Sequence, residues 1–214
     1  VIGENGGIVM RDGVEVSSSP LDAPTMREVV RLVREATSGP DGIDGGLVMC
    51  GKQFAYVERT DDRFVDGVMP YYHRTKRVDD QIAIIDAIEA GQIDDAIVKL
   101  AVYVIGPVQA LAQATLANFA DTHQYAISGA NWADLQIRGV DKGSAVRDLQ
   151  RFLGVDRSQT AVFGDAGNDL SMMSEGDLSF AMANASRDVV EAARFVAPSN
   201  NEAGVAQVLR ALLV

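Results

Sequence analysis

Short apolar runs alternate with helically spaced apolar positions through the last third of the chain. The runs predict buried strands, and apolar residues that recur every three or four positions predict helices. We expect strands over 161–163 and 178–182, and a helix over 142–153 that ends before Gly154. The predicted buried face of that helix carries Ala145, Val146, Leu149 and Phe152. Strict alternation of this kind indicates a parallel sheet with helices on its faces.

The pattern is different between residues 18 and 136, where hairpins are mixed with helices. Residues 45–58 predict a hairpin that turns at Gly51 and Lys52. Further strands are expected over 96–105, 123–127 and 133–137. Helices are expected near Pro24, after Asp80 and from Pro107, and the last of these is expected to continue without a break to Phe119. This mixture predicts an α+β module with a mostly antiparallel sheet.

The first residues are predicted to belong with the last third of the chain. Val1-Ile2-Gly3 has the composition of the tail of a buried strand, and Asp12-Gly13 lies between two alternating runs, as in a hairpin. The predicted fold class is therefore α/β: a doubly wound, Rossmann-like core, incomplete at its N-terminus, with an inserted α+β domain. The expected boundaries place 1–17 and 137–214 in the core and 18–136 in the inserted domain.

The amino-acid composition excludes some kinds of binding partner. The net charge of −11 argues against nucleic acid and anionic membrane, but not against a phosphorylated substrate held by a local cation. No apolar run approaches the roughly 20 residues that span a bilayer, and the start has no signal peptide pattern. The single cysteine, Cys50, fits a reducing compartment. We expect a cytoplasmic protein, and the sequence does not indicate its oligomeric state.

Candidate chemistry is concentrated in Thr160–Met173, which reads TAVFGDAGNDLSMM. A short apolar run stops at Gly164, and two carboxylates, Asp165 and Asp169, follow within a glycine turn. Ligands of open α/β sheets bind beyond the carboxyl ends of the strands, and two carboxylates suit Mg²⁺. A helix N-cap and a single calcium-binding repeat are alternative interpretations. An EF-hand loop is excluded, because its twelfth position would be Gly176 and not glutamate.

The neighbouring segments decide between these interpretations. DKGSA at 141–145 precedes the acidic turn, AMANA at 181–185 and NEAGVA at 201–206 follow it, and ENGG lies at 4–7. This ordered set resembles the haloacid dehalogenase-like phosphatases, specifically the Cof-type sugar-phosphatase branch with a type IIB cap. The resemblance covers nearly the whole chain. It implies that the inserted α+β domain is the cap and that the remainder is the phosphatase core.

The resemblance also implies roles for particular residues. Lys142, at a predicted helix start that favours an anion, is expected to bind phosphate, and Asp165 to hold Mg²⁺; both are expected to be catalytic. Asp169 is expected in the inner or outer shell of the same Mg²⁺. Asn168 is expected either to contact the substrate or to fix the loop, and Asn5 to face the substrate or to form part of a turn.

The nucleophile of the family is an Asp-x-Asp motif, and the 214 residues contain none. The expectation from sequence is that this segment is absent and that residues 1–214 alone have no turnover. The predicted function is Mg²⁺-dependent hydrolysis of a small phosphorylated metabolite, such as a sugar phosphate, through an aspartyl-phosphate. The alternatives are a phosphomutase on the same scaffold and a non-catalytic module that binds Mg²⁺ and phosphate.

Overall fold

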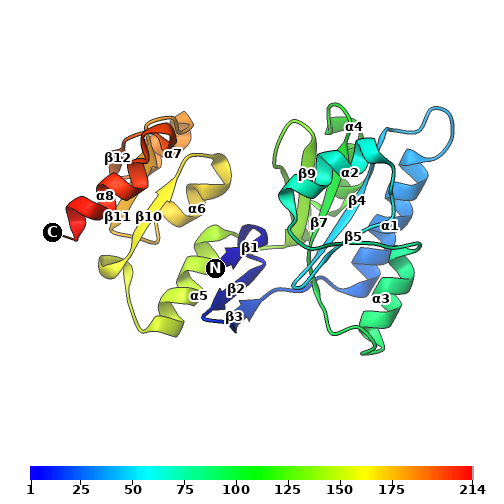
Figure 1. Cartoon of the computed structure of the whole chain (residues 1–214), viewed down its shortest axis with the longest axis horizontal. Helices are drawn as coiled ribbons and strands as arrows, with labels where there is room; N and C mark the ends of the chain where they lie inside the picture. The colour runs from blue at the N-terminus through cyan, green and yellow to red at the C-terminus, as the bar shows by residue number, and fades with distance from the viewer. Residues whose placement is uncertain (214) are drawn as a thin grey trace. The chain divides into compact units, whose positions relative to one another are not determined.

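The computed structural model describes residues 1–213, and the chain forms two compact units (Figure 1). Unit 1 contains Val1–Ser18 and the chain from Val140 onward, and unit 2 contains Ser19–Gly139. The chain therefore passes between units at 18/19 and 139/140, where the sequence pattern put the boundaries at 17/18 and 136/137.

Unit 1 contains two separate three-stranded sheets. One is antiparallel and is built from β1 (Ile2–Gly3), β2 (Ile8–Arg11) and β3 (Val14–Ser18). The other is parallel and is built from β10 (Ala161–Gly164), β11 (Leu178–Met182) and β12 (Phe195–Ala197). The helices of this unit are α5 (Lys142–Leu153), α6 (Leu170–Met173), α7 (Arg187–Ala192) and α8 (Gly204–Leu212). Parallel strands joined through helices confirm the predicted α/β class.

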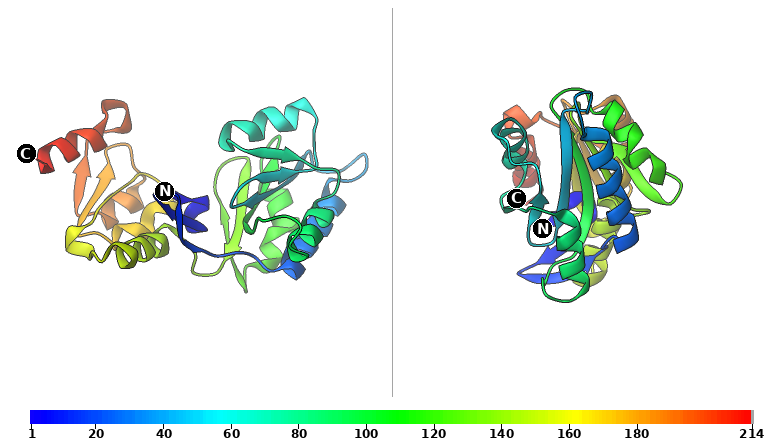
Figure 2. Two further views of the ribbon diagram at one scale, coloured as in Figure 1. Left: turned by 60° about the horizontal axis from the view of Figure 1, so that its bottom comes forward. Right: turned by 90° about the vertical axis from the view of Figure 1, so that its right-hand side faces the viewer.

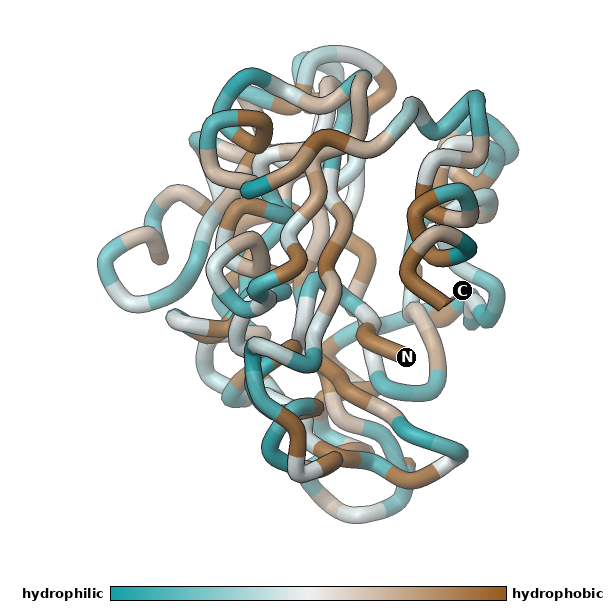
Figure 3. The backbone as a smooth tube through the Cα atoms, turned by 90° about the vertical axis from the view of Figure 1, so that its left-hand side faces the viewer, coloured by the Kyte–Doolittle hydropathy of each residue, from teal (hydrophilic) through white to brown (hydrophobic). Residues whose placement is uncertain are grey.

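Apolar side chains pack on both faces of the parallel sheet. Val146, Val162, Met173, Ala181 and Val189 form one cluster between the strands and α5, α6 and α7. On the opposite face, Phe180, Met182 and Ala197 pack against Phe163 and Val208, the latter on α8. In Figure 3, α8 can be found next to the C-terminus, with hydrophobic and hydrophilic positions alternating along it. The sheet is thus covered on both sides, as in a doubly wound fold.

The buried face predicted for α5 is wrong at one position. Phe152 is 52% exposed, while Gln150 is buried. The Gln150 amide donates hydrogen bonds to Thr160 Oγ1 at 2.9 Å and to the Glu175 carbonyl oxygen at 2.6 Å. The second half of α5 therefore faces two polar loops, and a glutamine satisfies those loops where an apolar side chain would not.

Unit 2 is built on a six-stranded sheet with the order β6-β5-β4-β7-β9-β8. The strands are β4 (Gly45–Gly51), β5 (Ala55–Val57), β6 (Thr75–Arg77), β7 (Ile97–Val104), β8 (His123–Ile127) and β9 (Trp132–Ile137). Only the pair β5 and β6 is parallel, which confirms the mostly antiparallel sheet expected from the hairpin pattern.

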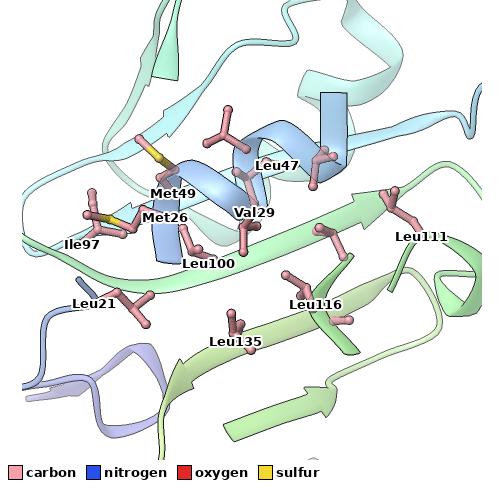
Figure 4. Close-up of a cluster of buried hydrophobic side chains, with 14 of the residues drawn as sticks. Leu21, Met26, Val29, Leu47, Met49, Ile97, Leu100, Leu111, Leu116 and Leu135 are labelled. Carbon is pink, nitrogen blue, oxygen red and sulfur yellow. The ribbon is translucent and has the colours of Figure 1, made fainter. Parts of the chain in front are cut away.

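Three helices pack on one face of this sheet: α1 (Ala23–Thr37), α3 (Gln81–Glu89) and α4 (Gln109–Ala114). Figure 2 shows α1, in blue, running along the strands. Figure 4 shows Met26 and Val29 of α1 in one buried cluster with Leu47, Leu100 and Leu135 of the sheet. The first turn of α1 is fixed by a proline and by the side chain of the N-cap residue, whose carboxylate accepts a hydrogen bond from the backbone of the third helical residue.

The opposite face of the same sheet is covered by α2 (Asp62–Val68), whose Phe64 and Val68 pack on Val48 and Ala101. The sequence pattern did not predict α2 or β6, because residues 59–78 carry no sustained periodicity. The helix expected unbroken from Pro107 to Phe119 is also wrong. It is interrupted at Thr115, where φ is −123° and ψ is −84°, and it continues as a 3₁₀ turn over Leu116–Phe119.

Candidate active site

The acidic turn after β10 is held together by Asp169. This side chain is only 4% exposed, and its Oδ2 accepts hydrogen bonds from the backbone N–H groups of Asp165, at 2.9 Å, and Ala166, at 3.1 Å. A 3₁₀ turn over Gly167–Asp169 directs the Asp169 carboxylate back toward the end of β10. Gly164 is required for this closure, because a Cβ atom there would lie 2.6 Å from the Cβ of Asp169.

Lys142 approaches the same carboxylate from α5. Its Nζ lies 2.5 Å from Asp169 Oδ1, and its side chain is 28% exposed. The start of α5 is fixed by a capping box: the Asp141 carboxylate accepts from Ser144 N–H at 2.7 Å, and Ser144 Oγ accepts from Asp141 N–H at 3.0 Å. Capping of this kind sets the first helical residue, and with it the direction of the Lys142 side chain.

The contact between α5 and α6 supports this arrangement. The backbone N–H of Gly143 donates to Ser171 Oγ at 3.0 Å, and a Cβ atom at Gly143 would lie 2.5 Å from the Ser171 carbonyl oxygen. Glycine therefore allows the two helices to approach closely at the site. The sequence analysis missed Ser171, because a serine inside a helix has no signal that distinguishes it from a surface residue.

The electrostatic state of Asp169 follows from its surroundings. Burial acts to raise the pKa of the Asp169 carboxyl, but the hydrogen bonds from Lys142 and from two backbone N–H groups outweigh burial, so the pKa lies below its ordinary value of 3.8. The carboxylate is therefore charged at neutral pH, and Lys142 is its counterion. Both oxygens of Asp169 are engaged within the protein.

Asp165 differs from Asp169 in both its exposure and its hydrogen bonding. Its side chain is exposed at the end of β10, and no donor within residues 1–213 forms a hydrogen bond with its carboxylate. Asp165, Lys142 and Asp169 face one cavity of about 430 Å³ in unit 1. The cavity is otherwise lined by Ile2, Phe163, Gly164, Met172, Met182, Asn200 and Val205. It combines apolar walls with a charged end that has one free carboxylate.

The two asparagines predicted at the site lie beside the charged group. Asn168 Nδ2 donates a hydrogen bond to Asn5 Oδ1 at 3.2 Å, and Asn5 has a left-handed backbone with φ 51° and ψ 30°. This bond ties the 3₁₀ turn at Glu4–Gly6 to the acidic turn, and neither asparagine lines the cavity. Asn200, which does line it, was not predicted, although the Ser199 capping box directly before it marks a turn.

The side chains at this cavity determine whether a divalent cation could bind there. Within residues 1–213, no group of three His, Cys, Asp or Glu side chains comes together to hold a metal. Asp165 offers an uncommitted carboxylate, whereas Asp169 does not. Mg²⁺ is usually held by one or two carboxylates, with substrate phosphate and water as the remaining ligands, so the residues present fit that ion.

Comparison with known proteins identifies the family to which the chain belongs. The family model of haloacid dehalogenase-like hydrolases matches residues 1–209. A phosphatase of Escherichia coli K12, 5-amino-6-(5-phospho-D-ribitylamino)uracil phosphatase YbjI, is 32% identical over 99% of this chain and 73% of its own length. The putative phosphatase YxeH of Bacillus subtilis is 45% identical over 34% of this chain and 27% of its own length.

Solved structures show the same fold. A haloacid dehalogenase-like hydrolase from Bacteroides thetaiotaomicron superposes with a TM-score of 0.79 at 19% identity, over 97% of this chain and 74% of that one. The subclass IIB sugar phosphatase BT4131 gives 0.71 at 17% identity, over 97% and 73%. The chain belongs to the haloacid dehalogenase-like hydrolases, and the resemblance drawn from its motifs is confirmed. The two relatives named above are a phosphatase and a putative phosphatase. A search of the helices through residue 213 found no segment with the length and apolar character to cross a membrane.

Proposed function

We propose that unit 1 binds the phosphate group of a small phosphorylated metabolite together with Mg²⁺, for hydrolysis of the phosphate ester. The observation that carries the proposal is the arrangement at the end of β10, where an exposed carboxylate, Asp165, faces the same cavity as the Lys142–Asp169 ion pair. Phosphoryl transfer depends mainly on positioning and on neutralising the charge of the phosphate oxygens, and these groups serve both needs.

Each residue has a distinct role in this proposal. Asp165 would hold Mg²⁺, which when bound neutralises phosphate charge. Lys142 directs its ammonium group to a phosphate oxygen, and Asp169 fixes the position of that ammonium group. Asn168 and Asn5 hold the acidic turn against the turn at Glu4–Gly6. The family resemblance assigns the attack on phosphorus to an Asp-x-Asp motif that these 214 residues lack, so we assign no nucleophile here.

The substrate class is proposed from the E. coli relative, whose name specifies a phosphorylated ribityl compound. A sugar phosphate or polyol phosphate of similar size is the corresponding substrate for this chain. The cavity in unit 1 is large enough for a phosphate group and its metal, at about 430 Å³.

Calorimetric titration with Mg²⁺ tests the metal site directly. Asp165→Asn should weaken Mg²⁺ binding at least tenfold, which corresponds to about 1.4 kcal/mol. Asp188→Asn is the matched control, because Asp188 is an exposed acid on α7 that does not line the cavity. Equal Mg²⁺ affinities in the two variants would contradict the assignment.

A second measurement separates hydrolysis from binding. The chain is incubated with Mg²⁺ and a chromogenic aryl phosphate, and phosphate release is recorded. Release that depends on Lys142 and Asp165 supports an esterase. Because these 214 residues lack the Asp-x-Asp motif, the assay is repeated with a chain that carries such a motif ahead of Val1. Binding of Mg²⁺ and phosphate without release by that longer chain would favour a module that binds both without catalysing hydrolysis.

A further inference from the structure

Three loops follow the carboxyl ends of the parallel strands β10, β11 and β12, and hydrogen bonds join these loops to one another. The backbone N–H of Ser186, after β11, donates to the carbonyl oxygen of Asp165, after β10, at 2.9 Å. The backbone N–H of Asn200, after β12, donates to Asn184 Oδ1 at 3.0 Å. The loop after β11 therefore contacts the acidic turn on one side and the turn that carries Asn200 on the other.

The turn that carries Asn200 is also fixed from within. The Glu202 carboxylate accepts hydrogen bonds from the backbone N–H and the hydroxyl group of Ser199, at 3.1 and 2.6 Å, and this capping box closes a 3₁₀ turn. Ala203, at the end of the turn, has a left-handed backbone with φ 54° and ψ 42°, although it is not a glycine. Strained backbone of this kind persists where the surrounding structure holds it, and it is concentrated at functional sites.

The side chain of Asn200 is uncommitted. Among the residues within 1–213 that line the cavity of unit 1, Asn200 is the only uncharged polar one; the other polar side chains are those of Lys142, Asp165 and Asp169. The backbone N–H of Asn200 donates to Asn184, and its carbonyl oxygen accepts from Ala203 N–H at 3.2 Å. Its side-chain amide has no hydrogen-bond partner in the described chain. The amide is therefore available to a ligand in the cavity.

The cavity has few side-chain donors for a phosphate group. Lys142 is the only basic lining residue in the part of the chain that the structure describes, and its ammonium group also pairs with Asp169. Ionised carboxylates such as those of Asp165 and Asp169 accept hydrogen bonds and donate none. The two N–H groups of the Asn200 amide are the remaining side-chain donors. A phosphate group in this cavity thus has two sources of side-chain hydrogen bonds, Lys142 and Asn200.

We propose that Asn200 donates a hydrogen bond from its side-chain amide to an oxygen of the bound phosphate group. This inference rests on the function proposed for unit 1, because it adds a contact to the same phosphate site. The capping box at Ser199 and the hydrogen bond to Asn184 hold the backbone of Asn200 in place, which reduces the ordering that binding would otherwise require.

Calorimetric titration of the full chain with inorganic phosphate, in the presence of Mg²⁺, tests this contact. Asn200→Ala removes the donor and should weaken phosphate binding about tenfold. Asn200→Asp keeps the shape of the side chain, and it keeps the turn because acids are favoured at the start of a helix. It replaces the donor by a negative charge, so it should weaken phosphate binding more than Asn200→Ala does.

The neighbouring asparagine provides the matched control. Asn201 lies in the same 3₁₀ turn and is exposed, but it does not line the cavity. Asn201→Ala should leave the phosphate affinity unchanged. Circular dichroism confirms that each variant is folded.

The outcomes separate this contact from the function on which it rests. A wild-type chain that binds no phosphate in the presence of Mg²⁺ would overturn both. Phosphate binding by the wild type that is equally strong in Asn200→Ala or in Asn200→Asp would overturn the contact alone. The same conclusion would follow if Asn201→Ala weakened phosphate binding as much as Asn200→Ala does.

Discussion

Substitution of Asp169 by asparagine separates the structural role of this acid from metal binding. Its carboxylate accepts two backbone hydrogen bonds and pairs with Lys142. Asparagine has nearly the same shape, and its oxygen can still accept both backbone hydrogen bonds. Its amide nitrogen, however, presents a donor to the ammonium group of Lys142. The substitution therefore removes charge and one acceptor without leaving a cavity.

The expected loss of stability follows from these contacts. Hydrogen bonds to a charged group contribute about 1.5–3 kcal/mol and neutral ones about 0.5–1.5 kcal/mol, so neutralising the acceptor of two bonds costs about 2 kcal/mol. Loss of the Lys142 pair adds less than the full value for a buried pair, because Lys142 is 28% exposed and can be solvated. We expect the free energy of unfolding of unit 1 to fall by about 2–3 kcal/mol.

The assay uses the distribution of aromatic residues. Trp132 and all five tyrosines lie within residues 19–139, so tryptophan fluorescence follows unit 2 alone, whereas far-ultraviolet circular dichroism follows both units. In urea, Asp169→Asn should lower the midpoint of the unit 1 transition by about 1–2 M and leave the fluorescence transition in place. Asp165→Asn is the control. Equal midpoints for the two variants would refute the structural role of Asp169.

The pH dependence gives a second check on the same substitution. The folded pKa of Asp169 lies below its ordinary value of 3.8, so the stability from its ionisation is fully present above the unfolded pKa and is lost as the pH falls through the folded pKa. The difference in stability between wild type and Asp169→Asn should therefore shrink as the pH is lowered below about 4. A constant difference from pH 7 to pH 3 would contradict this reasoning.

Three further predictions follow from the contacts. Lys142→Ala should weaken phosphate binding in the presence of Mg²⁺, or kcat/KM where turnover is measured, by about 2–4 kcal/mol. Gly164→Ala should destabilise unit 1 by about 1–3 kcal/mol in urea denaturation, because its Cβ would lie 2.6 Å from two side chains, whereas Gly167→Ala meets no atom within 4 Å and should stay within about 0.5 kcal/mol. Tyr56→Phe removes a buried hydroxyl that donates to a carboxylate at 2.9 Å and should cost about 1–3 kcal/mol by Trp132 fluorescence, while the exposed Tyr71→Phe should cost almost nothing.

The fold could be predicted from sequence wherever periodicity was sustained and its ends were marked. The helix expected over 142–153 is α5, Lys142–Leu153, because Asp141 caps its start and Gly154 adopts the left-handed conformation at its end. Periodicity failed where the backbone leaves the helical conformation beside a local side-chain hydrogen bond. At Thr115 the hydroxyl donates to the Leu111 carbonyl oxygen at 2.6 Å, and the helix is interrupted although its apolar spacing continues.

The candidate site could be predicted as a set of residues but not as a geometry. The motifs identified Lys142, Asp165 and Asp169, and the structure places all three at one cavity. Sequence spacing alone does not distinguish the role of Asp165 from that of Asp169. The difference between them, one buried under the turn and one exposed, depends on how the 3₁₀ turn directs each side chain.

The charges at the site give an independent reason to expect a divalent cation. Lys142 is the only basic residue among those that line the cavity in the part of the chain that the structure describes, and Asp169 already neutralises it. Asp165 leaves the group with a net charge of −1. A phosphate dianion that entered this site alone would meet a negative field, with only the partly shielded ammonium group of Lys142 in its favour. A divalent cation on Asp165 changes the sign of that field, so we expect phosphate binding to require the metal.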